Sequence, residues 1–163
     1  MALELNTAMA LTPEMRLAGL GLTLPSPPEP VANFVAWRRA GPMLYLSGQG
    51  PLEASGHLHV GRVGEEVDIE AAYLHARLTG LNLLAVAREA LGDLGRVRNV
   101  VKLLAFVNAV PGFAQHPRVI NGCSDLFVAV FGETIGRGAR SAIGAGSLPG
   151  NQTVEVEAIL EVD

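Results

Sequence analysis

With 163 residues, 49% of them hydrophobic and 17% charged, the chain is long enough for one domain with a substantial core. No segment approaches the roughly 18 uninterrupted apolar residues that span a bilayer, and no basic leader precedes an apolar run, so we expect neither membrane insertion nor a signal peptide. The net charge is −4 and the twelve basic residues are scattered, which argues against nucleic-acid binding.

At the N-terminal end, Thr12 and Pro13 predict the start of a helix, and Gly19 or Gly21 can end it. The proline-rich stretch 24–30 predicts an extended arm. We therefore expect residues 1–30 to form an N-terminal helix and arm, and residues 31–163 to form a single α+β domain.

Within that domain, turn residues and hydrophobic periodicity predict two helices and five strands. The expected elements are a strand at 43–47, a short strand at 58–60, a helix from Asp68 to about Gly92, a strand at 97–108, a helix within 112–133, and strands at 139–146 and 153–162. Pro117 suits the first turn of the second helix and Gly132 its end. The order β-β-α-β-α-β-β predicts two long helices on one face of a mixed sheet.

Several strands are apolar on both faces. The alternation places Val101, Leu103, Ala105 and Val107 on one side of their strand and Val100, Leu104 and Phe106 on the other, with Leu44 and Leu46 opposing Met43 and Tyr45. Two helices cover only one face of such a sheet, so a second copy of the chain is the simplest cover for the other. We expect a homo-oligomer.

The cysteine and histidine content limits the chemistry further. Cys123 is the only cysteine, so we expect no internal disulfide and a reducing, cytoplasmic location. It lies in a helix-like apolar run, which favours a packed thiol over a nucleophile. The four histidines, with His57 and His59 near a predicted hairpin tip, show no ligand spacing, so we expect no metal.

Charged residues stand out on the last two strands. Val154, Val156, Ala158 and Leu160 should face the helices, which leaves Glu155, Glu157 and Ile159 on the opposite, intersubunit face together with Arg140. A buried arginine needs a carboxylate. Either Arg140 pairs with a glutamate and locks an interface, or it binds a small carboxylate ligand while one glutamate handles a proton or water.

A family resemblance bears on this choice. From about residue 31 to the C-terminus, the chain resembles the YjgF-type reactive-intermediate (enamine/imine) deaminases, also called the endoribonuclease L-PSP or translation-inhibitor family. The segments that carry the resemblance are "YLSGQGP", the Asp68 helix, "VVKLLAFV", "GFA…VINGCSDLFVAVFGE", "ARSAIG" and "LPGNQTVEVEAI". The resemblance implies a chorismate-mutase-like fold of the bacillary type, assembled as a homotrimer with clefts between subunits.

It also implies roles for individual residues. The carboxylate-binding arginine matches Arg140 and the water-positioning glutamate matches Glu155, whereas Glu157 has a structural role. The other implied substrate-binding positions are Ser47, Gly48, Gln49, Asn121 and Ala142, together with Phe34, which stands where family deaminases carry a tyrosine. A phenyl ring can wall a pocket but cannot donate a hydrogen bond.

The implied activity is hydrolysis of small 2-imino or enamine acids to 2-keto acids and ammonia, without a cofactor. The alternative is a trimer that binds a small carboxylate without turnover, as a sensor. RNA cleavage, suggested by the family's other label, conflicts with the acidic charge and the absence of a basic patch.

Overall fold

The computed structural model describes residues 10–163, so the first nine residues of the predicted N-terminal segment 1–30 lie outside it. The elements are α1 (Pro13–Gly19), β1 (Trp37–Ala40), β2 (Met43–Gln49), α2 (Ile69–Leu91), β3 (Val97–Asn108), α3 (His116–Phe131), α4 (Glu133–Gly136), β4 (Ala139–Ala145) and β5 (Val154–Val162). Short 3-10 turns at Leu94–Arg96 and Pro149–Asn151 precede β3 and β5.

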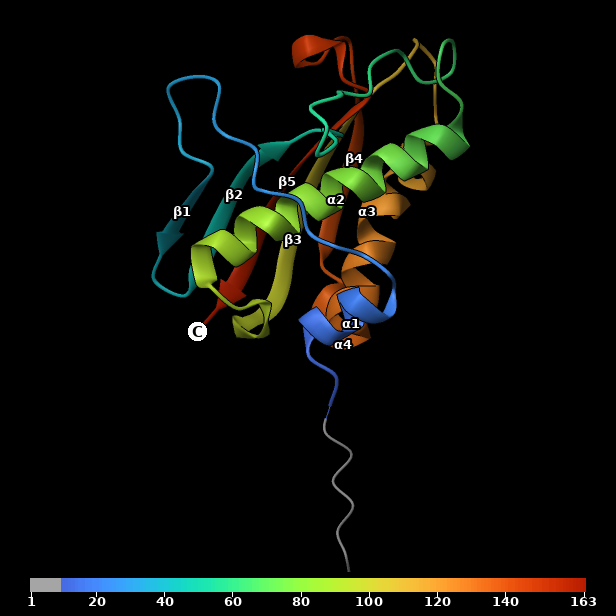
Figure 1. Cartoon of the computed structure of the whole chain (residues 1–163). Helices are drawn as coiled ribbons and strands as arrows, with labels where there is room; N and C mark the ends of the chain where they lie inside the picture. The colour runs from blue at the N-terminus through green and yellow to red at the C-terminus, as the bar shows by residue number, and fades with distance from the viewer. Residues whose placement is uncertain (1–9) are drawn as a thin grey trace, which may run out of the picture.

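The five strands form one sheet in the order β1-β2-β5-β3-β4 (Figure 1). Only β3 and β4 run parallel, joined by a crossover through α3, and the other neighbours are antiparallel. Both long helices lie against the same face of the sheet (Figure 1). The predicted α+β architecture, with a mixed sheet and two long helices on one face, is confirmed.

The helix ends follow the predicted capping residues. The Asp68 carboxylate accepts a hydrogen bond from the backbone N–H of Ala71 at 2.7 Å, and Gly92 ends α2 in the left-handed region at φ 78°. The hydroxyl of Thr12 caps α1 in the same way, accepting from Met15 N at 3.1 Å. Gly132 follows the last residue of α3, as predicted.

Two strand predictions were wrong. Residues 58–60 form only isolated bridges, because the positive-φ glycines Gly56 and Gly61 turn the chain on both sides of a three-residue run. The first strand is instead β1, which the sequence did not predict. Two of its four residues are arginines and three of the four are exposed, so the segment shows no apolar alternation. β1 depends on its antiparallel pairing with β2.

A bulge in β3 overturns one assignment of faces. Val100 is 3% exposed and faces the helices with Leu103, whereas Val101 is 37% exposed, although the alternation predicted that Val101 and Leu103 share a face. The pairing of β3 with β5 shifts register between Val100 and Lys102, so Val101 is the extra residue of the bulge. Beyond it the predicted alternation holds, and Leu103 is buried.

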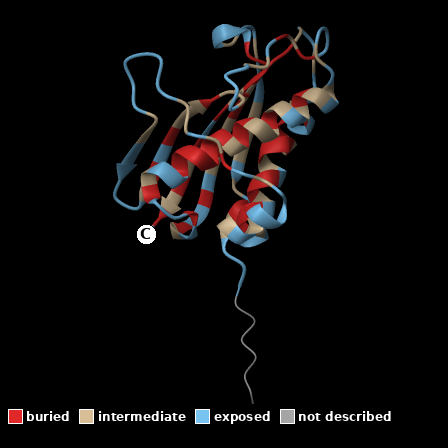
Figure 2. Cartoon of the chain, viewed as in Figure 1, coloured by how far each residue is buried: buried red, intermediate tan, exposed pale blue. Residues whose placement is uncertain are grey.

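The core fills the space between the sheet and α2 and α3, where the buried positions gather in Figure 2. Leu17 of α1 and Leu24 of the proline-rich stretch belong to the same core. On the opposite face of the sheet, Tyr45 and Ile143 remain 44% and 47% exposed. Among residues 10–163, no helix has the length and hydropathy needed to cross a membrane.

Candidate functional site

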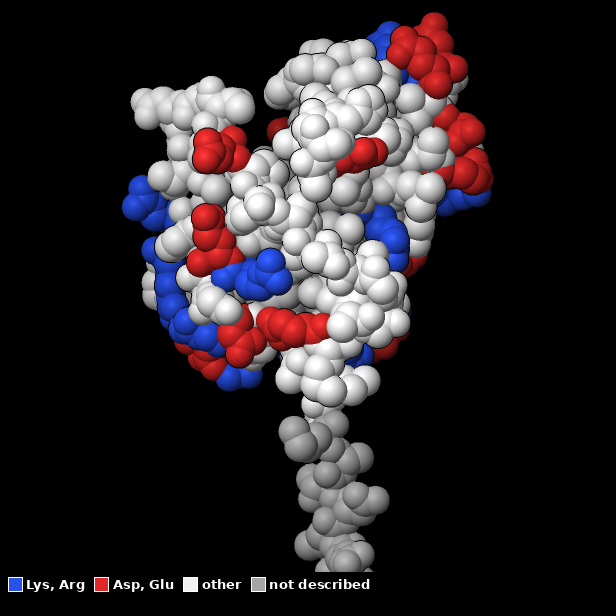
Figure 3. Space-filling model, viewed as in Figure 1, with Lys and Arg blue, Asp and Glu red and all other residues white. Residues whose placement is uncertain are grey.

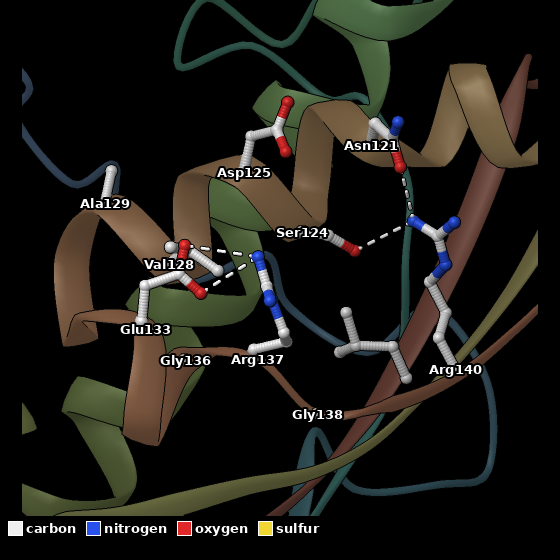
Figure 4. Close-up of a pocket in the computed structure, with 11 residues that line it drawn as sticks. Asn121, Ser124, Asp125, Val128, Ala129, Glu133, Gly136, Arg137, Gly138 and Arg140 are labelled. Carbon is white, nitrogen blue, oxygen red and sulfur yellow. Dashed lines mark hydrogen bonds and ion pairs between the residues drawn. The ribbon is translucent and has the colours of Figure 1, made fainter.

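The candidate residues fall into two separate hollows. The first, the Arg140 groove, has a volume of about 450 Å³ and lies between α3, α4 and β4 (Figure 4). It is lined by Leu103, Asn121, Ser124, Asp125, Val128, Ala129, Glu133, Gly136, Arg137, Gly138 and Arg140. The second, the Glu155 cavity, has a volume of about 540 Å³ and lies between the N-terminal arm, the end of β2 and the start of β5.

In the Arg140 groove, α3 holds the arginine in place. Nη1 of Arg140 donates hydrogen bonds to Oδ1 of Asn121 at 2.9 Å and to Oγ of Ser124 at 3.0 Å (Figure 4). The two acceptors are three residues apart and therefore share one face of the helix. The sequence predicted Asn121 but not Ser124, although this same spacing was visible in it.

The side of the sheet that Arg140 occupies differs from the prediction. Parallel pairing places Arg140 beside Leu103, whose side chain is buried against the helices, so Arg140 faces the helices as well. The expectation that it shares a face with Glu155 and Glu157 within one chain was wrong. Among residues 10–163 Arg140 forms no ion pair.

The other charged groups of the groove already have partners. Arg137 pairs with Glu133 at 3.0 Å, one helical turn apart and exposed to solvent. Asp125 accepts a hydrogen bond from the phenol of Tyr73 at 2.8 Å. Arg140 is therefore a half-buried cation, and no acidic side chain in the described part of the chain neutralises its charge. It is suited to bind an anionic ligand.

The Glu155 cavity is lined by Gly48 and Gln49 of the predicted "SGQ" segment and by the arm. Its lining residues are Pro28, Glu29, Pro30, Val31, Ala32, Phe34, Ala36, Gly48, Gln49, Gly50, Leu52, Leu58, Pro149, Gly150, Gln152 and Glu155. A Cβ atom on Gly48 would lie 3.0 Å from Cδ of Glu155. The glycine thus lets the β2 backbone approach the carboxyl group closely.

Glu155 itself is half-buried and accepts a hydrogen bond from Nε2 of Gln152 at 3.3 Å. Burial raises the pKa of Glu155, the bond from Gln152 opposes this shift, and the charge of Glu157 adds to it. A carboxylate with a raised pKa is suited to accept a proton from water. The sequence did not predict Gln152; in the structure Gly50 leaves room for it, since a Cβ there would lie 2.8 Å from Cδ of Gln152.

The remaining predicted residues occupy different places. Phe34 is 46% exposed in the wall of the Glu155 cavity, and Gln49 is buried there at 7% exposure. Ser47 lies outside this cavity, where its hydroxyl donates to the carbonyl oxygen of Val35 at 2.6 Å. Ala142 is half-buried against the core and lines neither hollow.

The two hollows have no residue in common, and strand β3 separates the edge strand β4, which carries Arg140, from the central strand β5, which carries Glu155. Glu155 is paired with Phe106 on the face away from the helices, whereas Arg140 reaches toward α3. One copy of the chain therefore does not bring Arg140 and Glu155 into a single site.

Cys123 and the histidines take no part in either hollow. Burial raises the pKa of the Cys123 thiol to about 12 and the side chain is fully enclosed, so the predicted packed thiol is confirmed. His59 lies 2.7 Å from a carboxylate oxygen of Glu53 and stacks on His75 at 4.3 Å between ring centroids. Among the described residues, no three His, Cys, Asp or Glu side chains are grouped to hold a metal ion.

Comparison with known proteins identifies the family. Residues 14–162 match the family model described as "YjgF/chorismate_mutase-like, putative endoribonuclease". The protein TCP17 of Trypanosoma cruzi is 40% identical over 147 residues, which cover 90% of this chain and 92% of TCP17. The crystal structure of Atu1372 from Agrobacterium tumefaciens, described as of unknown function, is 46% identical with a TM-score of 0.85 and covers 93% of this chain and 94% of its own.

A structure from Shewanella oneidensis, described as a "putative endoribonuclease", is 31% identical with a TM-score of 0.89 and covers 93% of this chain and 99% of its own. The sequence resemblance to YjgF-type proteins is therefore confirmed, and with it the chorismate-mutase-like fold. This chain belongs to the YjgF/chorismate mutase-like family.

Proposed function

We propose that this protein is a hydrolytic deaminase that converts small reactive 2-imino and enamine acids to 2-keto acids and ammonia. The observation that carries the proposal is the guanidinium of Arg140. Two hydrogen bonds that it donates to α3 fix its position, yet no carboxylate within residues 10–163 neutralises it. In a chain of this family, that arrangement supports a binding site for the carboxylate of a small acid.

The proposed site lies between copies of the chain. Because Arg140 and Glu155 are on opposite sides of the sheet in one copy, a site that uses both must take them from two copies. The exposed apolar side chains on the open face, Tyr45 and Ile143 among them, favour covering of that face by another copy. We propose a homotrimer, in which each cleft contains one Arg140 and one Glu155.

The proposed chemistry needs only these two groups and water. The substrate carboxylate accepts hydrogen bonds from Arg140, which orients the imine carbon. Glu155 takes a proton from water as the oxygen attacks that carbon, and the proton passes to the nitrogen to give a carbinolamine. Loss of ammonia from the carbinolamine, with the hydroxyl proton returning through Glu155, leaves the 2-keto acid.

RNA cleavage is the weaker candidate, although the Shewanella relative is described as a "putative endoribonuclease". The chain has sixteen acidic and twelve basic residues, which disfavours a polyanionic substrate. On the face shown in Figure 3, basic side chains lie among acidic ones and form no continuous basic surface.

The test compares the release of 2-keto acid from freshly generated 2-aminoacrylate and 2-iminobutyrate by the wild-type protein and by Arg140→Ala. We expect kcat/KM to fall on the order of 10²-fold in the variant, the scale lost when a positioning contact to the transition state is removed. Arg137→Ala is the matched control, because Arg137 lines the same groove but is 73% exposed in an ion pair. Its activity should stay close to wild type.

Three other outcomes would refute the proposal. Binding of a 2-keto acid that depends on Arg140 but occurs without turnover would indicate a carboxylate sensor. A change only in oligomer mass for Arg140→Ala would indicate an interface contact. A monomeric mass for the wild-type protein in dilute solution, measured by light scattering, would exclude a site made from two copies.

A further inference from the structure

The N-terminal arm forms one wall of the Glu155 cavity. Seven residues of the arm and its continuation, residues 28–36, line the cavity opposite β2 and β5, namely Pro28, Glu29, Pro30, Val31, Ala32, Phe34 and Ala36. The chain is fixed on both sides of this wall. Before it, Leu24 is 7% exposed in the core, and after it the N–H of Ser47 donates to the carbonyl oxygen of Ala36 at 2.9 Å.

The arm is therefore held beside the cavity at both of its ends. The hydroxyl of Ser47 adds a second bond to the arm, donating to the carbonyl oxygen of Val35 at 2.6 Å. Pro28 and Pro30 restrict the backbone further, because the proline ring fixes φ.

The cavity is polar at one end and apolar over most of the rest. Glu155 and Gln152, joined by a hydrogen bond, provide the polar end together with the buried Gln49, and Glu29 adds a carboxylate on the arm. The arm and the loops opposite it contribute proline, valine, phenylalanine and leucine side chains, of which Val31 is 95% exposed and Phe34 46% exposed. Apolar side chains that line a cavity and remain open to water favour binding of a ligand's hydrocarbon group.

The size of the cavity bears on the kind of ligand. Its volume of about 540 Å³ lies within the range of roughly 300 to 1,000 Å³ typical of pockets that enclose a whole small-molecule ligand. An acid of three or four carbons would reach Glu155 but would leave the wall formed by Val31 and Phe34 in contact with water. A longer side chain would cover that wall.

We infer that this site takes 2-imino acids with a bulky apolar side chain, branched aliphatic or aromatic, which packs against the arm while the imine carbon lies at Glu155. The inference rests on the proposed function for the position of the imine, and on the arm for the choice of side chain. Phe34 is the specificity-determining residue in this arrangement. Its phenyl ring contributes apolar surface without a hydroxyl group that would have to be desolvated.

The experiment measures kcat/KM for the imines of alanine, norvaline, leucine and phenylalanine, generated in situ by an amino-acid oxidase. Burial of each added methylene should raise kcat/KM about fourfold, so the leucine and phenylalanine imines should exceed the alanine imine by more than tenfold. Phe34→Ala should remove most of this advantage, so that kcat/KM for the leucine and phenylalanine imines approaches that for the alanine imine. Because Phe34 is largely exposed, the variant should fold normally.

Val35→Ala is the matched control. Val35 is the next residue of the arm and is 49% exposed, but it does not line the Glu155 cavity. The variant should therefore preserve the preference for bulky imines. Equal kcat/KM values across the series, or a Phe34→Ala variant that loses the alanine and phenylalanine imines in equal measure, would overturn the inference.

Binding separates this inference from the proposed function. Calorimetry with pyruvate, 4-methyl-2-oxopentanoate and phenylpyruvate measures side-chain preference without any turnover. Tighter binding of the two bulky acids that Phe34→Ala abolishes would support the apolar wall even if no imine were hydrolysed. Turnover of small imines with no preference for bulky side chains in either assay would support the proposed deaminase activity and refute the proposed role of the apolar wall.

Discussion

The contact between α2 and α3 at Gly122 positions the helix that holds Arg140, and it leaves no room for a side chain. A Cβ atom on Gly122 would lie 2.9 Å from the carbonyl carbon and closer still to the carbonyl oxygen of Tyr73, and 3.0 Å from the backbone nitrogen of Arg77. These are backbone atoms of α2, so no rotamer change relieves the overlap. Gly122→Ala must push the two helices apart.

The expected loss of stability follows from these distances. Carbon atoms pack best at about 3.5 to 4.0 Å, and the carbonyl oxygen of Tyr73 is closer than its carbonyl carbon, so the helices must separate by more than about 1 Å at this point. Overpacking of this kind costs about 1 to 3 kcal/mol, and the better helix propensity of alanine returns about 1 kcal/mol. Because the overlap is with backbone, we expect a net loss of about 2 kcal/mol, or about 4 to 8 °C in Tm for a domain of this size.

Gly80→Ala is the control in the same helix pair. Its Cβ would lie 3.1 Å from Cδ2 of Leu126 and 3.2 Å from Sγ of Cys123, and these side-chain atoms can adjust by a few tenths of an ångström. We expect a change of less than about 1 kcal/mol. The assay is urea denaturation followed by circular dichroism. Equal midpoints for Gly122→Ala and Gly80→Ala at an unchanged m-value would refute the reasoning.

Three further predictions follow from local contacts. Burial and a stacked imidazole lower the pKa of His75 to about 4. Between pH 6.5 and 4 the unfolded chain therefore binds a proton at this residue that the folded chain does not, so the free energy of unfolding should fall as pH drops through that window. Because His75 is partly exposed, we expect this loss of stability to be about 1 to 2 kcal/mol. Urea denaturation at about pH 7 and about pH 4.5 measures it, and His75→Gln should remove the difference between the two pH values. Gln152→Ala removes a bond that lowers the pKa of Glu155, so a carboxyl ¹³C titration should show a higher pKa, and an unchanged value would contradict the contact. Asp68→Ala should lower stability by about 1 kcal/mol through loss of the helix cap, whereas Asp68→Asn should retain most of it.

Local signals predicted the long elements well. The ends of α2 depend on a capping carboxylate at Asp68 and on a left-handed glycine at Gly92, and both are properties of a few adjacent residues. β1 carried no such signal, because it becomes a strand only through pairing with β2. The bulge at Val101 was also invisible, since a strict alternation cannot show where one residue is inserted.

Local signals also predicted part of the geometry of the candidate site. Alternation along β5 placed Glu155 on the face away from the helices, because the buried valines beside it fix the orientation of that strand. In β4 the small residues around Arg140 fit either face, and only the parallel register with β3 decides between them. Ser124 and Gln152 escaped prediction because each acquires its role from a hydrogen-bond partner in the folded chain.

The placement of Arg140 and Glu155 on opposite sides of one sheet leads to a decisive test of the proposed function. If each site takes Arg140 from one copy and Glu155 from another, then Arg140→Ala and Glu155→Gln proteins, each with about 1% of the wild-type activity or less, should complement each other when unfolded together and reassembled. In a cyclic trimer formed at random from equal amounts, about one quarter of the sites would contain both native residues, so about a quarter of the wild-type activity should return. If both residues acted within one copy, no mixture could contain an intact site and the activity would stay at the level of the separate variants. Analytical ultracentrifugation of the mixture confirms assembly, so an inactive but assembled mixture would refute the shared site.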